Sequence, residues 1–350
     1  MKKYGKEEVC RNLYLSPTDY HRYLMNSCEY PLSYRVGTDF GKWQRELRAQ
    51  LWNSIGGWPE KRCPLNVRSV WEKKHELGTI KKIVFTSEPY SDVTAYVCIP
   101  DETVPPYKWM ICLQGHSTGM HNSIAFDRDT EKKAIPVEGD RDFGLSCMRN
   151  GVAALCIEQR SFGERREQKQ KKVSSHGCHD AVMHALMLGK TLTGERVYDV
   201  DRGIDYLYTR KDVDRTKIGV MGNSGGGTIT LYAAALLPRV THAMPSGCFG
   251  TFRDSIMSIY HCGDNYIPGL MKYCEMYDVM GVFAPKPVVV VQGRYDEIFP
   301  VSPAIKSFAK LKKIYTAAGA KNNCALVIGN GGHRFYAADA WPVMNIMFNR

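Results

Sequence analysis

Short, nearly continuous apolar runs recur along residues 81–350, and helical patterns separate them. The expected strands are Trp109–Leu113, Val152–Ile157, Ile218–Met221, Val288–Val291 and Ala325–Ile328. The expected helices lie around Phe143–Arg149, Val197–Tyr208, Gly226–Leu236, Ile305–Ala318 and the C-terminus. Runs that are apolar throughout indicate strands buried on both faces, and their alternation with helices indicates a parallel arrangement. The pattern therefore predicts an α/β fold, with helices on both faces of a mostly parallel central sheet.

The first 80 residues have a different pattern. One stripe of apolar residues, spaced three or four positions apart, ends at Gly56-Gly57 and consists of Phe40, Trp43, Leu47, Leu51 and Ile55. This spacing is typical of an amphipathic helix. Two further apolar runs, Ile83–Phe85 and Ala95–Ile99, flank the turn-rich Pro89–Asp92 and predict a hairpin. We expect residues 1–80 to be an N-terminal helical extension on the core, and residues 81–350 to be the main domain.

Composition and charge narrow the class of protein. The chain has 350 residues, 47 Lys and Arg against 36 Asp and Glu, and 12 Cys. The excess of positive charge is spread along the chain, and only one stretch is densely basic. That stretch contains Arg165, Arg166, Lys169, Lys171 and Lys172, and Glu164 and Glu167 interrupt it. Because a nucleic-acid-binding protein concentrates its positive charge on one face or motif, we expect no nucleic-acid partner. No apolar segment approaches the roughly 18 residues of a membrane helix, and no apolar stretch follows the basic N-terminus. A reducing cytoplasm is the expected location, with no membrane partner.

The strongest local motif is Gly222-Asn223-Ser224-Gly225-Gly226, which follows an expected strand and begins an expected helix. A G-x-S-x-G sequence in this context is a nucleophile elbow, whose tight turn lifts the serine oxygen clear of the sheet. The alternative is a glycine-rich turn with a purely structural role. The helix that follows would favour negative charge at its N-terminus.

A nucleophilic serine needs a base, and the base needs an orienting acid. Asp296 follows the expected strand at Val288–Val291, and His333 follows the one at Ala325–Ile328. The order serine, acid, histidine is that of the elbow architecture, and sites in parallel sheets form at the carboxyl ends of strands. We therefore predict a triad of Ser224, Asp296 and His333, with Glu297 as the rival acid.

Acyl transfer also needs N–H groups that bind the oxyanion of the tetrahedral intermediate. The N–H of Gly225, the residue after the nucleophile, is one expected donor. The second should come from the loop after Trp109–Leu113, where Gly115 allows close approach and the N–H of His116 is our choice. The His116 side chain is an alternative base, but its place before Ser224 disfavours that role.

Other polar residues are weaker candidates. Gln114, Arg160 and Tyr266 could line a substrate pocket, although Arg160 could equally hold its loop by ion pairs. Metal-ligand residue types cluster near one another at His176, Cys178, His179 and His184. Their spacing matches no strong zinc pattern, so we expect neither a metal nor another cofactor.

Several longer stretches are typical of one superfamily. They are Gln114–His116, Arg160–Glu164, Gly189–Val200, Gly222–Gly227, Cys262–Gly269, Asp296–Pro300 and Gly331–Phe335. Over most of residues 80–340, the chain resembles the α/β-hydrolase superfamily and, within it, bacterial acetyl-xylan-esterase-like or dienelactone-hydrolase-like serine hydrolases. The resemblance implies an α/β-hydrolase fold for residues 81–350 and the same three triad residues. Gln114 replaces the first histidine of a His-Gly-His motif common in this branch, and Ser224 stands where dienelactone hydrolases have cysteine.

These observations predict a serine hydrolase of short-chain, acetyl-type carboxylic esters, which acts through an acyl-enzyme on a small-molecule substrate. One alternative is a hydrolase of small amides or peptides with the same triad. Another is a non-catalytic hydrolase fold that serves as a binding module. A homo-oligomer is compatible with the sequence, which leaves the oligomeric state open.

Overall fold

A nine-stranded mixed sheet forms the centre of the molecule in the computed structural model, which describes residues 14–116, 118–167 and 177–350. Parts of the basic stretch, Lys169, Lys171 and Lys172, and the candidate ligand His176 lie outside these residues. The strands are β1 Arg68–His75, β2 Gly78–Glu88, β3 Ser91–Pro100, β4 Tyr107–Leu113, β5 Ala153–Ile157, β6 Val213–Asn223, β7 His242–Ser246, β8 Val288–Gly293 and β9 Cys324–Gly329. Their spatial order is β1-β2-β3-β5-β4-β6-β7-β8-β9.

The sheet has an antiparallel edge and a parallel centre. β1, β2 and β3 pair antiparallel, and β3 pairs antiparallel with β5. All pairs from β5 through β9 are parallel. In this register, Leu113 is opposite both Ile157 and Gly222. The loops after β4, β6, β8 and β9 therefore leave the sheet at one edge, which is where parallel sheets build their sites.

The predicted burial of the central strands on both faces is confirmed. In β4, Trp109, Ile111 and Leu113 belong to one core cluster, whereas the intervening Met110 and Cys112 belong to a second. Successive strand side chains point to opposite faces, so two cores need apolar residues at every position. Each core is covered by its own helices.

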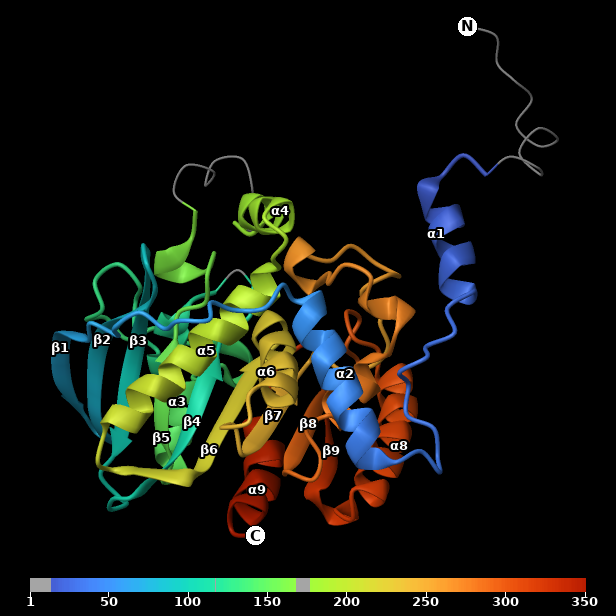
Figure 1. Cartoon of the computed structure of the whole chain (residues 1–350). Coiled ribbons are helices and arrows are strands. Elements are labelled where there is room, and N and C mark those ends of the chain that lie inside the picture. Colours follow the sequence, from blue (N-terminus) through green and yellow to red (C-terminus); the bar gives the residue numbers. More distant parts are fainter. Residues whose placement is uncertain (1–13, 117, 168–176) are drawn as a thin grey trace, which may run out of the picture.

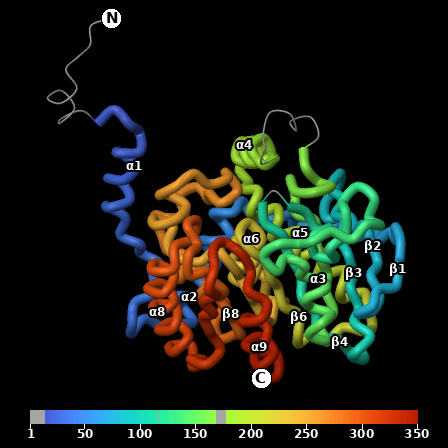
Figure 2. Tube along the Cα trace, turned by 180° about the vertical axis from the view of Figure 1, so that it is seen from behind, coloured from blue at the N-terminus to red at the C-terminus, as the bar shows by residue number. Residues whose placement is uncertain are grey.

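Most helices cover one or the other face of the sheet (Figures 1 and 2). The helices are α1 Pro17–Asn26, α2 Phe40–Ser54, α3 Phe143–Arg149, α4 His179–Met187, α5 Leu192–Thr209, α6 Gly225–Leu236, α7 Met276–Gly281, α8 Val301–Ala317 and α9 Ala337–Phe348. α1 and α4 lie outside the two layers that cover the sheet. The buried side chains of α2, α5, α6, α7 and α8 join the first core cluster, and those of α3 and α9 join the second. The prediction of an α/β fold with helices on both faces is therefore confirmed.

The N-terminal region differs in part from the expectation. α2 forms as predicted, and its buried Trp43, Leu47 and Leu51 pack into the first core. Residues 68–80, expected to be helical, instead form β1 and the start of β2. β1 is an edge strand with an exposed or half-exposed residue at every position, so its sequence carries no apolar run that would have signalled it.

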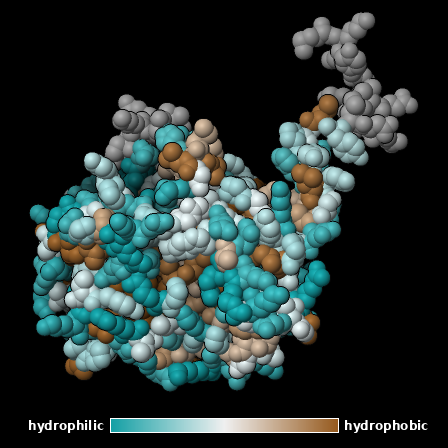
Figure 3. Space-filling view, viewed as in Figure 1, coloured by the Kyte–Doolittle hydropathy of each residue, from teal (hydrophilic) through white to brown (hydrophobic). Residues whose placement is uncertain are grey.

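The surface view shows a mostly hydrophilic face with hydrophobic side chains in small separate groups (Figure 3). One of these groups lies on α1, where Leu24 is exposed. Among the described residues, every helix is too short or too polar to cross a lipid bilayer.

Candidate active site

Ser224 lies at a strained turn between β6 and α6. Its backbone has φ 57° and ψ −123°, in a region that residues with a side chain rarely adopt. The turn is tight because the backbones cross closely: a Cβ on Gly222 would lie 2.6 Å from the Gly226 carbonyl carbon, and one on Gly226 would lie 2.0 Å from the Leu113 oxygen. The Ser224 N–H donates to the Ser246 carbonyl at 2.9 Å, which fixes the turn against β7. These contacts give the elbow geometry expected of a nucleophile.

His333 and Asp296 form a hydrogen-bonded pair. The Nδ1 atom of His333 lies 2.8 Å from Oδ2 of Asp296, whose side chain is buried. Oδ1 of Asp296 accepts the backbone N–H groups of Ile298 and Phe299, each at 2.9 Å, so the carboxylate cannot rotate freely. Nε2 of His333 is buried and has no hydrogen-bond partner in the described part of the chain. The ring therefore presents one nitrogen that is held and one that is available to take a proton.

The His333 ring lies beside the elbow. A Cβ on Gly247 would lie 3.1 Å from both the His333 Cε1 atom and the Asn223 Oδ1 atom. Gly247 therefore lies closely against the side chains of both His333 and Asn223. Asn223 in turn accepts a hydrogen bond from the Ser246 hydroxyl at 2.8 Å. The structure thus brings Ser224, Asp296 and His333 to one end of the sheet, from the ends of β6, β8 and β9.

The loop after β4 faces the elbow from the other side. A Cβ on Gly115 would lie 3.1 Å from Cβ of Ser224, and one on Gly225 would lie 2.9 Å from Nδ1 of His116. The two residues predicted to donate to an oxyanion, Gly225 and His116, are therefore close neighbours at the serine. Larger side chains at either glycine would push this loop away.

A buried ion pair holds the His116 ring. Its Nε2 atom lies 2.9 Å from Oδ1 of Asp264, and Oδ2 of Asp264 accepts a hydrogen bond from Arg196 on α5. The Arg196 guanidinium stacks over the Phe162 ring at 4.3 Å. Burial lowers the pKa of His116, but the Asp264 carboxylate outweighs burial and raises it to about 9. Neither Asp264 nor Arg196 received a role from the sequence, although both belong to stretches that carried the resemblance.

Two buried polar side chains support the loop after β4, which is the predicted oxyanion loop. Nε2 of Gln114 donates to the Ser123 hydroxyl at 2.8 Å and to the Arg141 carbonyl at 2.7 Å, so this side chain anchors the loop within the protein. The Glu158 carboxylate accepts the N–H groups of Met120 and Glu164, each at 3.1 Å. Burial raises the pKa of Glu158 to about 7.

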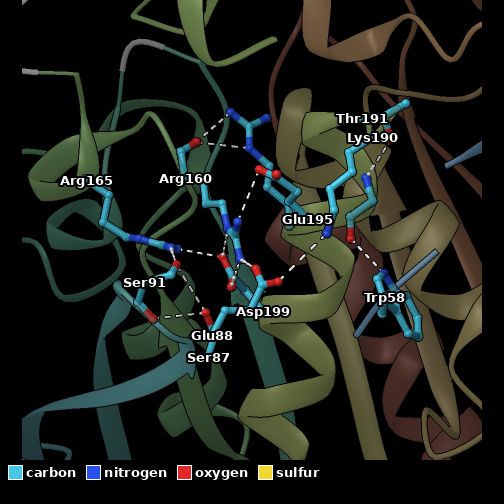
Figure 4. A network of polar contacts seen from close by, with 12 residues as sticks. Trp58, Ser87, Glu88, Ser91, Arg160, Arg165, Lys190, Thr191, Glu195 and Asp199 are labelled. Atoms are coloured by element: carbon cyan, nitrogen blue, oxygen red, sulfur yellow. Dashed lines mark hydrogen bonds and ion pairs between the residues drawn. The ribbon is translucent and has the colours of Figure 1, made fainter. Parts of the chain in front are cut away.

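Arg160 is the centre of an ion-pair network rather than a free cation (Figure 4). Its guanidinium pairs with Glu88 at 2.5 Å, Asp199 at 3.0 Å and Glu195 at 3.1 Å. Burial raises the pKa of Asp199, but Arg160 and Arg165 outweigh burial and hold the pKa well below its usual range. The ion-pair alternative considered for this loop matches these contacts, and a contact of Arg160 with substrate stays a prediction.

Tyr266 borders a small apolar pocket system. Its hydroxyl donates to the Ile256 carbonyl at 2.9 Å, and its ring is partly exposed. A neighbouring small cavity of about 10 Å³ lies closer to Ser224, since Thr228 follows Ser224 by one helical turn. Its lining is mainly apolar and consists of Thr228, Leu231, Tyr232, Cys248, Phe252, Ile256, Asn265, Met276 and Phe299.

Of the candidate metal-ligand residues near residue 180, His179 and Cys178 lie in different surroundings. His179 is exposed and contacts its neighbour Asp180 at 3.0 Å. Cys178 instead points inward, where Arg196 donates to its sulfur at 3.4 Å. Because 18 positions separate Arg196 from Cys178, their contact could not be inferred from the spacing of residues 176–184.

The fold and the elbow geometry define the class of protein. A mostly parallel sheet with an antiparallel edge, a nucleophile elbow after a central strand, and an acid and a histidine after later strands make this an α/β-hydrolase. Residues 24–323 match the Abhydrolase family, and the chain belongs to that family.

Relatives of known sequence or structure agree with this class. The Bacillus subtilis (strain 168) protein "Putative hydrolase YtaP" is 23% identical over 297 residues, which cover 82% of this chain and 93% of that protein. A "putative acetyl xylan esterase" from Bacteroides fragilis NCTC 9343 superposes with a TM-score of 0.76 at 16% identity, over 91% of this chain and 82% of the other. A glucuronoyl esterase from Solibacter usitatus superposes with a TM-score of 0.66 at 15% identity, over 91% and 96%. At these identities, the solved structures show a shared fold.

Proposed function

We propose that this protein is a serine esterase that hydrolyses short-chain, acetyl-type carboxylic esters. The observation that carries the proposal is the His333 ring, which contacts Asp296 through Nδ1 and leaves Nε2 without a partner among the described residues, beside the strained Ser224. A general base with one nitrogen oriented by a carboxylate is what a serine nucleophile requires. The family match and the esterase names of its structural neighbours support the same reaction class.

In this mechanism, Nε2 of His333 takes the proton of the Ser224 hydroxyl as its oxygen attacks the ester carbonyl. The negative charge on the carbonyl oxygen is held by the N–H groups of Gly225 and His116, at the N-terminus of α6. Asp296 keeps the imidazole proton on Nδ1 and stabilises the imidazolium that forms. His333 then protonates the departing alcohol, and water repeats the attack on the acyl-enzyme.

The pocket beside the nucleophile supports a small acyl group. Its small volume of about 10 Å³ and its apolar lining favour no more than a short acyl chain, and Phe252 lines both this cavity and the one bordered by Tyr266. Partly exposed Tyr266 and exposed Tyr295 offer rings on which a sugar leaving group could stack. The named substrates of the structural neighbours, xylan acetates and glucuronoyl esters, are carbohydrate esters and support that leaving group.

A series of p-nitrophenyl esters from acetate to octanoate tests the proposal. We expect wild type to prefer acetate and Ser224→Ala to lose about 10³-fold or more of the rate, because the nucleophile carries the chemistry. Ser302→Ala is the matched control, since Ser302 is exposed on α8. Full activity in Ser224→Ala would refute the nucleophile, and a preference for octanoate would refute the small acyl pocket. Acetylated xylo-oligosaccharides then test the carbohydrate leaving group.

A further inference from the structure

Four side chains with metal-binding atoms meet beneath the oxyanion loop. They are His116, Cys178, Cys262 and Asp264, and one ligand atom from each lies within 4.8 Å of those of the other three. They come from three separate parts of the chain: the loop after β4, the N-terminal end of α4, and the segment that begins the 3-10 helix Gly263–Asn265. Cys178 and Asp264 are buried, whereas His116 and Cys262 are half-buried.

The donor set favours a transition-metal ion such as zinc over the hard cations. Two sulfurs and an imidazole favour zinc over magnesium or calcium, which prefer oxygen ligands throughout. Bonds of about 2.3 Å to sulfur and 2.0–2.2 Å to nitrogen and oxygen would place donor atoms roughly 3.3–3.8 Å apart on a tetrahedral ion. Shifts of about 1 Å would therefore bring these four atoms onto one ion. Four protein ligands close the coordination sphere, which is typical of a structural zinc site.

The surroundings supply the groups that commonly support such ligands. Arg196, itself buried, donates to Oδ2 of Asp264 and lies 3.4 Å from the Cys178 sulfur. The Thr193 hydroxyl donates to the Asp264 backbone carbonyl, which fixes the segment that carries both Asp264 and Cys262. Hydrogen bonds of this kind orient ligands and raise metal affinity.

The charges also balance. Zn²⁺ and the Arg196 guanidinium carry three positive charges, and two thiolates and the Asp264 carboxylate carry three negative ones, with His116 neutral. Burying this set as a neutral group avoids the desolvation penalty of an unpaired charge. Loading the metal releases the protons of the two thiols and of the imidazole.

We propose that His116, Cys178, Cys262 and Asp264 bind a structural Zn²⁺ ion. The ion would join the loop that carries the His116 N–H to the start of α4 and to residues 262–264. The proposed zinc site does not depend on the proposed esterase function. Only an effect of the ion on the rate of ester hydrolysis would depend on that function, because the ion would touch the oxyanion loop. Metal binding is measured without any substrate, so the two proposals can fail independently.

The test measures metal in the full-length protein, produced with added zinc and purified under reducing, chelator-free conditions. We expect about one zinc per chain by elemental mass spectrometry, the number of metals that a closed four-ligand site holds. Cys178→Ser and Cys262→Ser should each lose most of it, whereas Cys28→Ser should keep it, since Cys28 lies outside the cluster. Thermal melts show whether each variant is folded.

Cobalt substitution of the wild-type protein gives a second readout that needs no variant. Bound Co²⁺ should show thiolate-to-metal charge-transfer absorption and the strong visible bands of a tetrahedral site. Zinc should also protect Cys178 and Cys262 from alkylation. Three results would each overturn the proposal: zinc-free wild type that binds no Co²⁺, zinc retained in both serine variants, or a Cys178–Cys262 disulfide in the non-reduced peptide map.

Discussion

Replacing Asp296 with asparagine is the sharpest perturbation of the proposed triad, because the structure dictates how the new amide must sit. Oδ1 of Asp296 accepts two backbone N–H groups, those of Ile298 and Phe299, so the asparagine oxygen should take that position. The amide NH₂ then replaces Oδ2 and points at Nδ1 of His333, 2.8 Å away. As a donor, it stabilises the tautomer whose proton is on Nε2, which cannot accept the Ser224 proton.

The expected loss follows from this change of tautomer. In a serine protease, the same substitution leaves the geometry intact and lowers kcat about 10⁴-fold, and we expect 10³- to 10⁴-fold here, or about 4–5 kcal/mol of transition-state stabilisation. The Gln292 amide also donates to Oδ2 at 3.2 Å, and two donors would then face each other. We therefore expect a modest loss of thermal stability in addition, of about 1–3 kcal/mol.

The assay is p-nitrophenyl acetate hydrolysis with parallel thermal melts. Glu297→Gln is the matched control, because Glu297 is the adjacent, exposed carboxylate that the sequence offered as the rival acid. We expect Glu297→Gln to keep near wild-type kcat/KM. A folded Asp296→Asn protein with kcat within 10-fold of wild type, or a larger loss in Glu297→Gln, would refute the assignment of the acid.

Three further outcomes follow from individual contacts. Burial raises the pKa of Glu158 to about 7. At pH values between the ordinary pKa of a glutamate and about 7, the folded state therefore holds a proton that the unfolded state has lost, and the free energy of unfolding falls as the pH rises through this range. Denaturant titrations should show that wild type loses up to about 3 kcal/mol more than Glu158→Gln between pH 5 and pH 8, and equal losses would contradict this. Phe252→Ala should raise the octanoate-to-acetate ratio about 10-fold by opening the acyl pocket, and an unchanged ratio would place the acyl group elsewhere. Gly226→Ala would place its Cβ 2.0 Å from the Leu113 oxygen and should cost about 3 kcal/mol or more in a thermal melt, whereas Gly250→Ala, with 3.9 Å of clearance, should melt near wild type.

Much of the fold could be predicted because burial is visible in the sequence. A strand covered on both faces must be apolar at every position, so β4, β5, β6, β8 and β9 stood out as short continuous runs. β1 was missed because an exposed edge strand needs no such run. β7 was missed because His242, Pro245 and Ser246 leave it without a continuous apolar run.

The candidate site was predictable where a local turn defines a role. The Ser224 elbow needs its glycines because main chains cross there, and this requirement can be read from five consecutive residues. The pair of Asp264 and Arg196 could not be found in this way, because 68 positions separate the two residues. Arg160 was ambiguous for the same reason, since its ion-pair partners come from β2 and α5.

Labelling with a fluorophosphonate, followed by peptide mass mapping, tests the central claim most directly, because it reports the nucleophile without requiring knowledge of the substrate. The account predicts one adduct per chain, located on Ser224, absent in Ser224→Ala and strongly slowed in His333→Ala. A folded wild-type protein that remains unlabelled, or that is labelled at another serine, would contradict it.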